Sequence, residues 1–365
     1  MKIGIAARGL GGQGGPKQYI ESLTSALLKI DRENEYYYFY NSTDYKGKYP
    51  EANEIVLKSS SKLIWDYYLI PKAVQDYNID VMLFPKNVLP FNISCKSVIV
   101  IHDLAYYMPE LNAYPFIDTA YMKLMIKSSV KRTNHIIAIS ESTKKDIIKF
   151  TGAEDEKITV VYEASDGKYE QIFDKSELDV IKKKYILPEQ FIFCCDSITP
   201  RKNTIRLLNA FNVIKDKVPH KLVLTGGVSW KSKKVSDLVD SMKDNVIKLG
   251  YVPDEDMPLL YNLADIFVYP SLYEGFGLPP LEAMACGCPV ITSNTSSIPE
   301  VVGEAGVMVD PYNIDDLAKA IYEVLTDGEL REDMIKKGLG RAKQFNWEKC
   351  ANETLQTFMD VSYNE

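Results

Sequence analysis

The sequence predicts an α/β protein with two doubly wound domains, each a parallel sheet covered by helices on both faces. The chain has 365 residues, which is more than one hydrophobic core usually supports. Short apolar, β-branched runs alternate with amphipathic helical patterns, as in parallel sheets joined by crossover helices. These runs form two sets of six, separated by a polar segment at 163–185.

The two sets of runs define the expected strands and domains. The first set covers residues 2–6, 36–40, 81–84, 97–101, 135–139 and 158–162, and the second covers 191–195, 221–225, 246–249, 266–269, 289–292 and 306–309. A charged helix begins near Ser176, so we place the hinge near Asp174, between domains 1–173 and 174–345. Two such domains facing one another would leave a cleft at the carboxyl ends of both sheets, where such folds bind ligands.

Composition excludes several classes of function. Basic side chains number 43 against 50 acidic ones, a net charge of −7 with no basic tail, so nucleic acid is not an expected partner. The N-terminus lacks a signal-peptide pattern, and no apolar stretch reaches about 20 residues, so we expect a cytoplasmic protein. Six cysteines and three histidines form no C-x-x-C or H-x-x-x-H arrangement, which predicts neither disulfides nor a metal site.

A glycine-rich loop follows the first expected strand. Residues 9–14 read GLGGQG, which fits the dinucleotide fingerprint G-x-G-x-x-G before an expected helix. That fingerprint also needs an acidic residue about 20 positions on, at the end of the next strand. Here that distance falls at Asn34 and Glu35, which precede the strand. The loop therefore predicts a phosphate contact and leaves open whether the ligand is a dinucleotide.

The most informative stretch is SLYEGFGLPPLEAMACGCPVIT at residues 271–292. Its double proline starts a helix that Gly287 ends, so Glu274 belongs to the preceding loop and Glu282 to the first turn. Backbone amides at the helix start suit anionic oxygens, and two carboxylates suit vicinal hydroxyls, so the stretch fits a nucleotide-linked sugar. The alternative is a sharp strand-to-helix turn in which the glutamates only cap the helix.

Two more candidate sites follow expected strands. Arg201 and Lys202 come after the run at 191–195 and offer a guanidinium and an ammonium to a diphosphate. If the pair is only solvated, Asn203 simply caps the next helix. His102 and Asp103 directly follow the run at 97–101, at the expected carboxyl edge of the first sheet. A solvated basic pair and a structural histidine are the competing interpretations.

Taken together, these motifs resemble family 4 glycosyltransferases of the GT-B fold, and within them the mannosyltransferase-like branch. The resemblance rests on YEGFGLPPLEAMACGCPVI, on PRKN at 200–203, on HDL at 102–104 and on LGYVPDEDMPLLYNLADIFVYPS at 249–271. It covers essentially the whole chain. The pair of glutamates eight residues apart, with its flanks, is the most specific part.

The resemblance implies a retaining hexosyltransferase that needs no metal or other cofactor. It would have two Rossmann-like domains and would bind a nucleoside-diphosphate sugar mainly through the second. Glu274 would hold the transferred sugar, Arg201 and Lys202 the diphosphate, and His102 the sugar from the first domain, with Asp103 a weaker option as acceptor-side base. The donor contacts implied are Gly14, Gly15, Val252, Gly275, Phe276, Gly277, Leu278 and Glu282, the last on the ribose hydroxyls. The glycine loop would then face the phosphates of a nucleotide sugar and not NAD.

Two positions depart from the family pattern. Ser197 stands where many relatives carry an arginine, so the charge of the diphosphate would be compensated by Arg201 and Lys202 alone. Lys17 replaces what is often a further glycine, which leaves the register of the loop open. No candidate base lies with a carboxylate partner, so we infer front-face transfer in which the acceptor proton passes to a phosphate oxygen.

The acceptor is expected on the first domain and is a glycan or a lipid-linked glycan. Segment 118–134 combines apolar residues at helical spacing with Lys123, Lys127, Lys131 and Arg132. An ordinary core-packed helix with a wet basic face is the favoured interpretation, and a peripheral contact with the inner membrane face is the alternative. By the family likeness, the closing helix at 346–365 would pack back on the first domain.

The residues leave other functions open. A sugar-nucleotide epimerase of the same fold would need no acceptor, and a non-catalytic nucleotide-sugar-binding protein would release no nucleoside diphosphate. A phosphorylase would need a cofactor lysine motif that we do not find. GDP-mannose and UDP-linked hexoses are the leading donors, and polysaccharide or glycolipid assembly is the expected setting.

Overall fold

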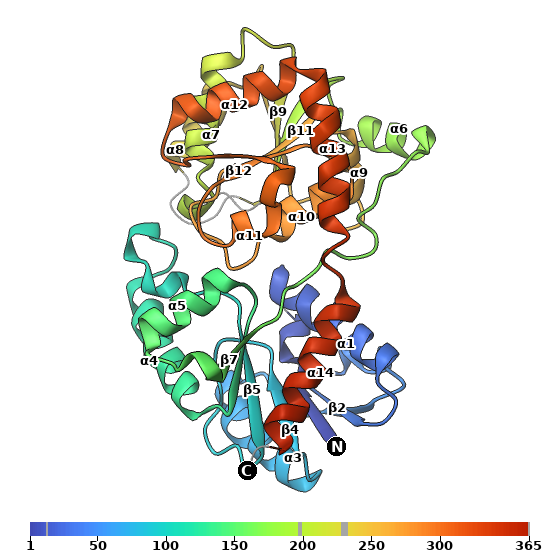
Figure 1. Ribbon diagram of the computed structural model, residues 1–365, viewed down its shortest axis with the longest axis vertical. Coiled ribbons are helices and arrows are strands. Elements are labelled where there is room, and N and C mark those ends of the chain that lie inside the picture. The colour runs from blue at the N-terminus through green and yellow to red at the C-terminus, as the bar shows by residue number, and fades with distance from the viewer. Residues whose placement is uncertain (12–13, 196–198, 228–232, 364–365) are drawn as a thin grey trace. The chain divides into compact units, whose positions relative to one another are not determined.

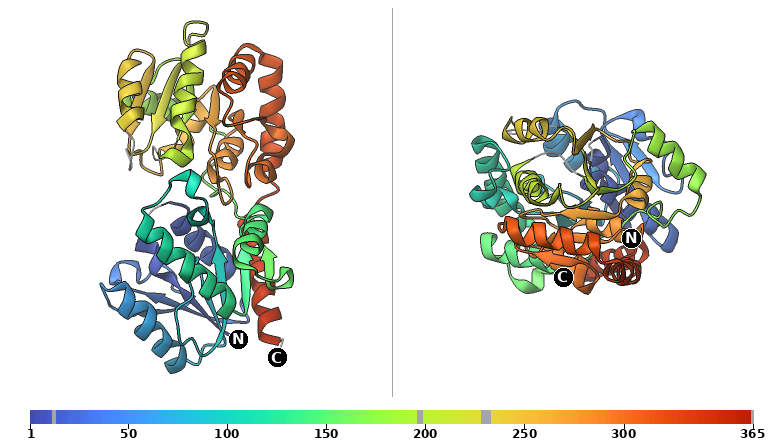
Figure 2. Two further views of the ribbon diagram at one scale, coloured as in Figure 1. Left: turned by 90° about the vertical axis from the view of Figure 1, so that its left-hand side faces the viewer. Right: turned by 90° about the horizontal axis from the view of Figure 1, so that it is seen from above.

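A computed structural model describes residues 1–11, 14–195, 199–227 and 233–363. The chain divides into two compact units (Figure 1). The first unit comprises Met1–Tyr107, Tyr114–Ala164 and Asn346–Glu365, and the second comprises Met108–Ala113 and Ser165–Phe345. Each unit contains one parallel sheet between helices, as the two further views in Figure 2 show. The predicted fold of two doubly wound α/β domains is therefore confirmed.

The first unit is built on a sheet of seven parallel strands in the order β3-β2-β1-β4-β5-β6-β7. The strands are β1 (Lys2–Ala6), β2 (Glu35–Tyr40), β3 (Asn53–Val56), β4 (Val81–Phe84), β5 (Lys96–Ile101), β6 (His135–Ala138) and β7 (Ile158–Val160). Six of them are the predicted strands. Strand β3 was not predicted, because it begins with Asn53 and Glu54 and pairs only at the sheet edge with β2, where polar residues are tolerated.

Helices on both faces of this sheet bury its apolar side chains. They are α1 (Gly15–Ile30), α2 (Lys62–Ile64), the π-helix η3 (Trp65–Leu69), α3 (Ile70–Asp76), α4 (Phe116–Arg132), α5 (Glu141–Thr151) and α14 (Trp347–Tyr363). Short 3-10 turns are η1 (Ala7–Gly11), η2 (Thr43–Tyr45), η4 (Ala105–Tyr107) and η6 (Asp155–Lys157). Although α14 ends the chain, it packs against α1 and belongs to the first unit, through buried residues such as Phe358 (Figure 1).

The second unit contains six parallel strands in the order β10-β9-β8-β11-β12-β13, all of them predicted. They are β8 (Phe191–Cys194), β9 (Lys221–Thr225), β10 (Val246–Gly250), β11 (Ile266–Tyr269), β12 (Val290–Ser293) and β13 (Val307–Val309). The helices are α6 (Lys175–Lys184), α7 (Thr204–Ile214), α8 (Lys233–Ser241), α9 (Met257–Leu263), α10 (Leu278–Ala285), α11 (Ile298–Val302), α12 (Ile314–Thr326) and α13 (Gly328–Ala342), with 3-10 turns η5 (Pro109–Leu111), η7 (Pro200–Lys202) and η8 (Gly303–Ala305).

The chain passes from the first unit to the second at Ala164, ten residues before the hinge expected near Asp174. The polar segment between them is held on the second unit by Asn262, whose amide donates to the carbonyl of Glu170 and accepts from the amide of Ile172. The ring of Tyr169 also packs edge-on against Tyr261 at 5.9 Å. These contacts fix a segment whose composition is typical of a linker, and composition alone does not predict them.

Helix α4, which covers most of the predicted basic segment 118–134, differs between its two halves. Its C-terminal half packs Ile126 and Val130 into the core of the first unit. Its N-terminal half exposes Phe116, Ile117 and Leu124. Core packing is thus present, and contact with a membrane surface stays a prediction. Within the residues described, no helix combines the length and apolar character that crossing a bilayer requires.

Gly306, which precedes β13, tests the close packing of the second unit. A Cβ atom added there would lie 2.5 Å from Cγ2 and 2.8 Å from the carbonyl oxygen of Val290. We expect Gly306→Ala to lower the free energy of unfolding by about 1–3 kcal/mol, because the strand backbone must shift. Urea denaturation followed by circular dichroism measures this. Gly340→Ala on α13, where a Cβ meets open space, should instead be neutral or stabilising by up to about 1 kcal/mol.

Candidate active site

The carboxyl ends of β8 and β11 lie together at the centre of the second sheet. From β8 the chain continues to β9 and β10 on one side, and β11 leads to β12 and β13 on the other. Such a reversal of strand order is where doubly wound sheets bind ligands. The segment after β8 carries Arg201 and Lys202, and the segment after β11 carries Glu274. The sequence therefore brings these three predicted residues to one edge of the sheet.

Asn203 fastens the two segments to each other. Its side-chain amide donates to the carbonyl oxygens of Pro270, at 3.0 Å, and Pro311, at 2.7 Å. The amide of Leu272 donates to the carbonyl of Arg201 at 2.8 Å. Asn203 is the N-cap residue of α7, as predicted, but it makes no side-chain capping bond and has a φ of 60°. Its long-range bonds instead hold the basic pair in place.

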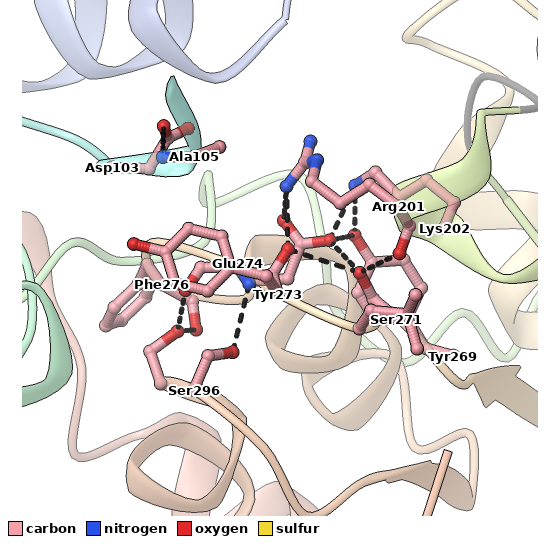
Figure 3. Close-up of polar contacts among 12 residues, drawn as sticks. Asp103, Ala105, Arg201, Lys202, Tyr269, Ser271, Tyr273, Glu274, Phe276 and Ser296 are labelled. Carbon is pink, nitrogen blue, oxygen red and sulfur yellow. Dashed lines mark hydrogen bonds and ion pairs between the residues drawn. The ribbon is translucent and has the colours of Figure 1, made fainter. Parts of the chain in front are cut away.

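The carboxylate of Glu274 is the centre of a buried polar cluster (Figure 3). Its Oε2 accepts from Nη1 of Arg201 at 2.8 Å, and its Oε1 accepts from Nζ of Lys202 at 2.8 Å. Two hydroxyls, of Ser271 at 2.5 Å and Tyr269 at 3.0 Å, also donate to Oε1. Lys202 in turn donates to the Tyr269 hydroxyl at 2.6 Å. Cations that could bind a diphosphate are thus held beside a carboxylate.

This arrangement keeps Glu274 ionised. Burial on its own would raise the pKa of the carboxyl group, but the charges of Arg201 and Lys202 and the hydrogen bonds from Lys202 and Ser271 outweigh it and lower the pKa to about 2. A carboxylate that stays charged throughout the neutral range cannot donate a proton to a leaving group. Its chemistry is therefore to accept hydrogen bonds, from its neighbours here and from ligand hydroxyls.

The loop after Glu274 leads into the start of α10, where glycine would let a ligand approach the backbone closely. Gly277 has a φ of 122°, and a Cβ there would lie 2.9 Å from Cδ1 of Ile298, so only glycine fits. The hydroxyl of Ser297 donates to the carbonyls of Glu274, at 2.9 Å, and Phe276, at 2.6 Å. In the described part of the chain, the backbone amides of Gly277 and Leu278 have no hydrogen-bond partner. They are available to an anionic oxygen at the start of α10.

Glu282 lies deeper than expected. Helix α10 begins at Leu278, so Glu282 is its fifth residue and stands just past the first turn, not within it. The side chain is buried, and its Oε2 accepts from the Tyr261 hydroxyl at 3.3 Å. The helix begins at Leu278, one residue before the predicted start at Pro279. Glu282 remains in the same unit and near the same strand ends as Glu274.

Two other predicted positions frame this edge of the second sheet. Val252 follows β10 and is buried, and the carbonyl of the preceding Gly250 accepts from the amide of Gly226 at 2.7 Å. The loop that would line a nucleobase is therefore tied to the end of β9. Ser197, where the family pattern departs, lies outside the described residues.

The first unit has its own cavity, of about 600 Å³, at the carboxyl ends of β1, β4 and β5. The strand order reverses between β1 and β4, so this too is the expected ligand position. His102 and Asp103 line the cavity, as do Pro16 and Lys17 at the start of α1. Gly14 precedes α1 with a φ of 78°, which favours glycine, and among the described residues the amides of Gly14 and Gly15 have no partner.

His102 is held by two acceptors. Its Nε2 lies 3.1 Å from the carbonyl oxygen of Pro85, and its Nδ1 lies 3.2 Å from Oε1 of Glu163. A carbonyl oxygen only accepts, so the contact with Pro85 requires that Nε2 donates. The ring of Tyr19 packs edge-on against the imidazole at 5.1 Å. Orientation of the imidazole is thus fixed from three sides.

Asp103 plays a local role beside this histidine. Its Oδ1 accepts from the backbone amide of Ala105 at 3.0 Å, which closes a turn after β5 (Figure 3). Its carbonyl accepts from the side-chain amide of Asn87, whose own oxygen accepts from the amide of His102 at 3.0 Å. A role for Asp103 as a base stays a prediction.

Glu163 is the main site residue that sequence reasoning missed. It is buried, and it lies three residues after β7, where the polar segment begins. A carboxylate just beyond the last strand of the first sheet was the available signal, because the ends of parallel strands share one edge. Its polar surroundings are typical of a linker, and no local pattern indicates its contact with His102.

The Glu274 cluster predicts a specific dependence of stability on pH. The pKa of Glu274 is about 2 in the folded protein against an ordinary 4.5, so the cluster stabilises the fold fully above pH 4.5 and loses that effect as the pH falls toward 2. The contribution is on the order of 3 kcal/mol. Glu274→Gln should therefore lower the free energy of unfolding by about 3–5 kcal/mol at pH 7, because two cations lose their carboxylate.

Guanidinium chloride denaturation of both proteins between pH 7 and 3 measures this difference. We expect the gap to narrow below pH 4.5, as protonation removes the same charge from the wild-type chain. Glu332→Gln on the exposed face of α13 is the matched control and should follow the wild type throughout. A gap that stays constant with pH would contradict the ionised state of Glu274.

The chain is similar in sequence to known glycosyltransferases. The family described as "Glycosyl transferases group 1" matches residues 178–341, within the second unit. The O-antigen chain mannosyltransferase B of Escherichia coli is 34% identical over 291 residues, covering 78% of this chain and 76% of the relative. The O-antigen chain mannosyltransferase RfbU of Salmonella typhimurium is 32% identical over 265 residues, covering 68% and 70%.

A solved structure extends the likeness to the whole fold. Anabaena HepE in complex with UDP-glucose superposes with a TM-score of 0.78 at 19% identity, covering 99% of this chain and all of that one. At this identity the likeness concerns the fold alone. Together with the mannosyltransferase relatives, it shows that the chain belongs to the family 4 glycosyltransferases, with the GT-B fold.

Proposed function

We propose that this glycosyltransferase moves a hexose, and specifically mannose, from a nucleoside-diphosphate sugar to a hydroxyl of a glycan or lipid-linked glycan, with retention of anomeric configuration and without a metal. The observation that carries the proposal is the buried cluster in which Arg201 and Lys202 meet Glu274 at the reversal of the second sheet. It combines cations for a diphosphate with a carboxylate for sugar hydroxyls at one strand edge.

The donor would bind the second unit in three parts. The diphosphate would take its charge compensation from Arg201 and Lys202 and from the amides of Gly277 and Leu278, which have no partner in the described chain. The ribose hydroxyls would donate to Glu282, whose buried carboxylate also accepts from the Tyr261 hydroxyl. The base would lie against the backbone around Val252. These positions explain why two glutamates are buried at one sheet edge.

The bond changes in the proposed step need no separate proton donor. The C1–oxygen bond to the diphosphate breaks, and both electrons leave with the diphosphate, whose growing charge Arg201 and Lys202 offset. The acceptor oxygen forms the new bond to C1 on the same face and gives its proton to a phosphate oxygen. Glu274, ionised by its neighbours, positions the sugar and takes no proton. Asp103 as base is the second option.

The identity of the sugar rests on the relatives. Both close relatives described above are named mannosyltransferases acting in O-antigen chains, which favours mannose and, as donor, GDP-mannose over a UDP-linked hexose. Their names also favour a polysaccharide acceptor. An epimerase or a non-catalytic sugar-nucleotide-binding protein would share the donor site but would transfer nothing to an acceptor.

The donor assignment predicts a selective thermal shift. GDP-mannose should stabilise the native chain by about 2.7 kcal/mol at a hundredfold excess over its dissociation constant, because only the folded state binds it. Glu282→Gln should weaken binding 10- to 100-fold, since a charged acceptor for ribose hydroxyls is lost. Differential scanning fluorimetry with GDP-mannose, UDP-glucose, UDP-galactose and NAD measures this, and Glu332→Gln is the control. Stabilisation by NAD alone would overturn the transferase assignment of the donor site.

Stereochemistry and metal dependence test the reaction itself. Proton NMR of the product formed from GDP-α-mannose and a mannoside acceptor should show an α-linkage, because entry and departure share one face. Activity should be unchanged after dialysis against EDTA, since the two cationic side chains supply the positive charge. A β-linked product would exclude front-face transfer, and loss of activity restored by Mg²⁺ or Mn²⁺ would exclude a metal-free site.

A further inference from the structure

In the second unit, a buried tyrosine holds the glutamate proposed to bind the ribose. Tyr261 on α9 is fully buried, and its hydroxyl donates to Oε2 of Glu282 on α10 at 3.3 Å. The two helices pack against each other. A buried carboxylate needs hydrogen bonds to replace the water that it has lost, so this bond offsets part of the cost of burying Glu282. It also fixes the direction of the carboxylate, because a rigid ring carries the hydroxyl.

Aromatic packing keeps the ring of Tyr261 in place. Phe193 on β8 and Phe267 on β11 meet it edge-on, with ring centroids 5.3 Å and 5.2 Å away. Tyr169, on the polar segment after β7, also meets it edge-on, at 5.9 Å. A ring enclosed by three others has little freedom to turn in a close-packed interior. The hydroxyl is therefore positioned by the same two strands that lead into the Glu274 cluster.

A thiol determines where the hydroxyl proton points. Sγ of Cys195, directly after β8, lies 3.2 Å from the Tyr261 oxygen, and this side chain is buried as well. A phenol has a single proton, and Tyr261 gives it to Glu282, so the thiol must donate in the contact with Tyr261. The three groups form a chain in which Cys195 donates to Tyr261 and Tyr261 donates to Glu282. Hydrogen bonds aligned in this way polarise and strengthen one another.

Three acids near Glu282 keep their protons at neutral pH. Burial raises the pKa of Tyr261 well above its usual range, and the neighbouring Cys195 and Glu282 raise it further. Burial, and then the charge of Glu282, also raise the pKa of Tyr169 and of Cys286. Tyr261 therefore remains a hydrogen-bond donor to the glutamate at any pH at which the folded protein would work.

We propose that Tyr261 is a positioning residue for the sugar donor, because it orients the Glu282 carboxylate toward the ribose hydroxyls while Cys195 orients Tyr261. The inference rests on the proposed function, since it deepens the assignment of Glu282 to the ribose. A carboxylate has about four acceptor positions, so the bond from Tyr261 sets the direction of the others. A nucleotide without ribose hydroxyls would leave these buried positions unpaired, which makes the site selective for ribose. Tyr261 acts through Glu282 and does not itself contact the ligand.

Nucleotide titrations test this without turnover. GDP and UDP are each titrated calorimetrically into the full chain beside their 2′,3′-dideoxy forms, so that the result does not depend on the base. For the base that binds more tightly, the wild type should prefer the ribose form by about 10- to 100-fold, because the hydroxyls bond a charged acceptor. Tyr261→Phe keeps the ring and removes the hydroxyl. It should lower this preference about 3- to 10-fold and leave affinity for the dideoxy form unchanged.

Matched variants separate positioning from a general structural role. Tyr36→Phe removes a comparably buried hydroxyl, which donates to Oδ2 of Asp31 in the first unit at 2.7 Å, and should leave the preference unchanged. In a Glu282→Gln background, Tyr261→Phe should have no further effect on the preference, because its effect passes through that carboxylate. Cys195→Ser keeps a hydrogen-bond donor to Tyr261 and should retain the wild-type preference, whereas Cys195→Ala should lower it.

The outcomes distinguish this inference from the proposed function. Equal weakening of the ribose and dideoxy forms by Tyr261→Phe, or an unchanged preference, would overturn the positioning role and leave Glu282 on the ribose. A further loss of preference in the Glu282→Gln background would also overturn it, because Tyr261 would then act elsewhere. Failure of the wild type to distinguish either ribonucleotide from its dideoxy form would instead overturn the proposed placement of the ribose on Glu282.

Discussion

The buried carboxylate of Glu274 is the constraint on which the second unit's ligand edge depends. An ionised group with so little exposure is tolerable only when cations and donors surround it, and here Arg201, Lys202 and Ser271 do so. The hydrogen bonds to Glu274 therefore join the segment after β8 to the segment after β11, although Arg201 and Glu274 are more than 70 residues apart in sequence. Asn203 adds to this junction, because its side chain donates to the carbonyls of Pro270 and Pro311 from a left-handed backbone conformation.

Much of the fold could be predicted because parallel strands buried on both faces appear as apolar, β-branched runs. Strand β3 could not, since Asn53 and Glu54 lie at a sheet edge where burial no longer selects for apolar residues. The first unit ends at Ala164, before the predicted hinge, for a related reason. Polar residues from 165 to 174 are typical of a linker, yet Asn262 and Tyr261 hold them on the second unit.

The candidate site could be predicted to the level of strand ends and no further. Positions such as His102, Arg201 and Glu274 follow strands, and the ends of parallel strands share one edge, so their grouping within each sheet is expected. The hydrogen-bond partners of these residues are not expected, because they lie far away in the sequence. Glu163 and His102 are 61 residues apart, and Asn203 and Pro311 are 108 residues apart. Local patterns carry no information about such pairs.

The cations of the two units differ in how they pair with carboxylates, and this affects how each unit would respond to an anionic ligand. A diphosphate at Arg201 and Lys202 must share these cations with Glu274, so its net electrostatic gain is the difference between two favourable arrangements. An anion in the cavity of the first unit would instead meet Lys62 and Lys86, with Asp66 as the neighbouring carboxylate. Salt screens exposed charges more than buried ones. The first unit's anion affinity should therefore fall more steeply with ionic strength than the second unit's.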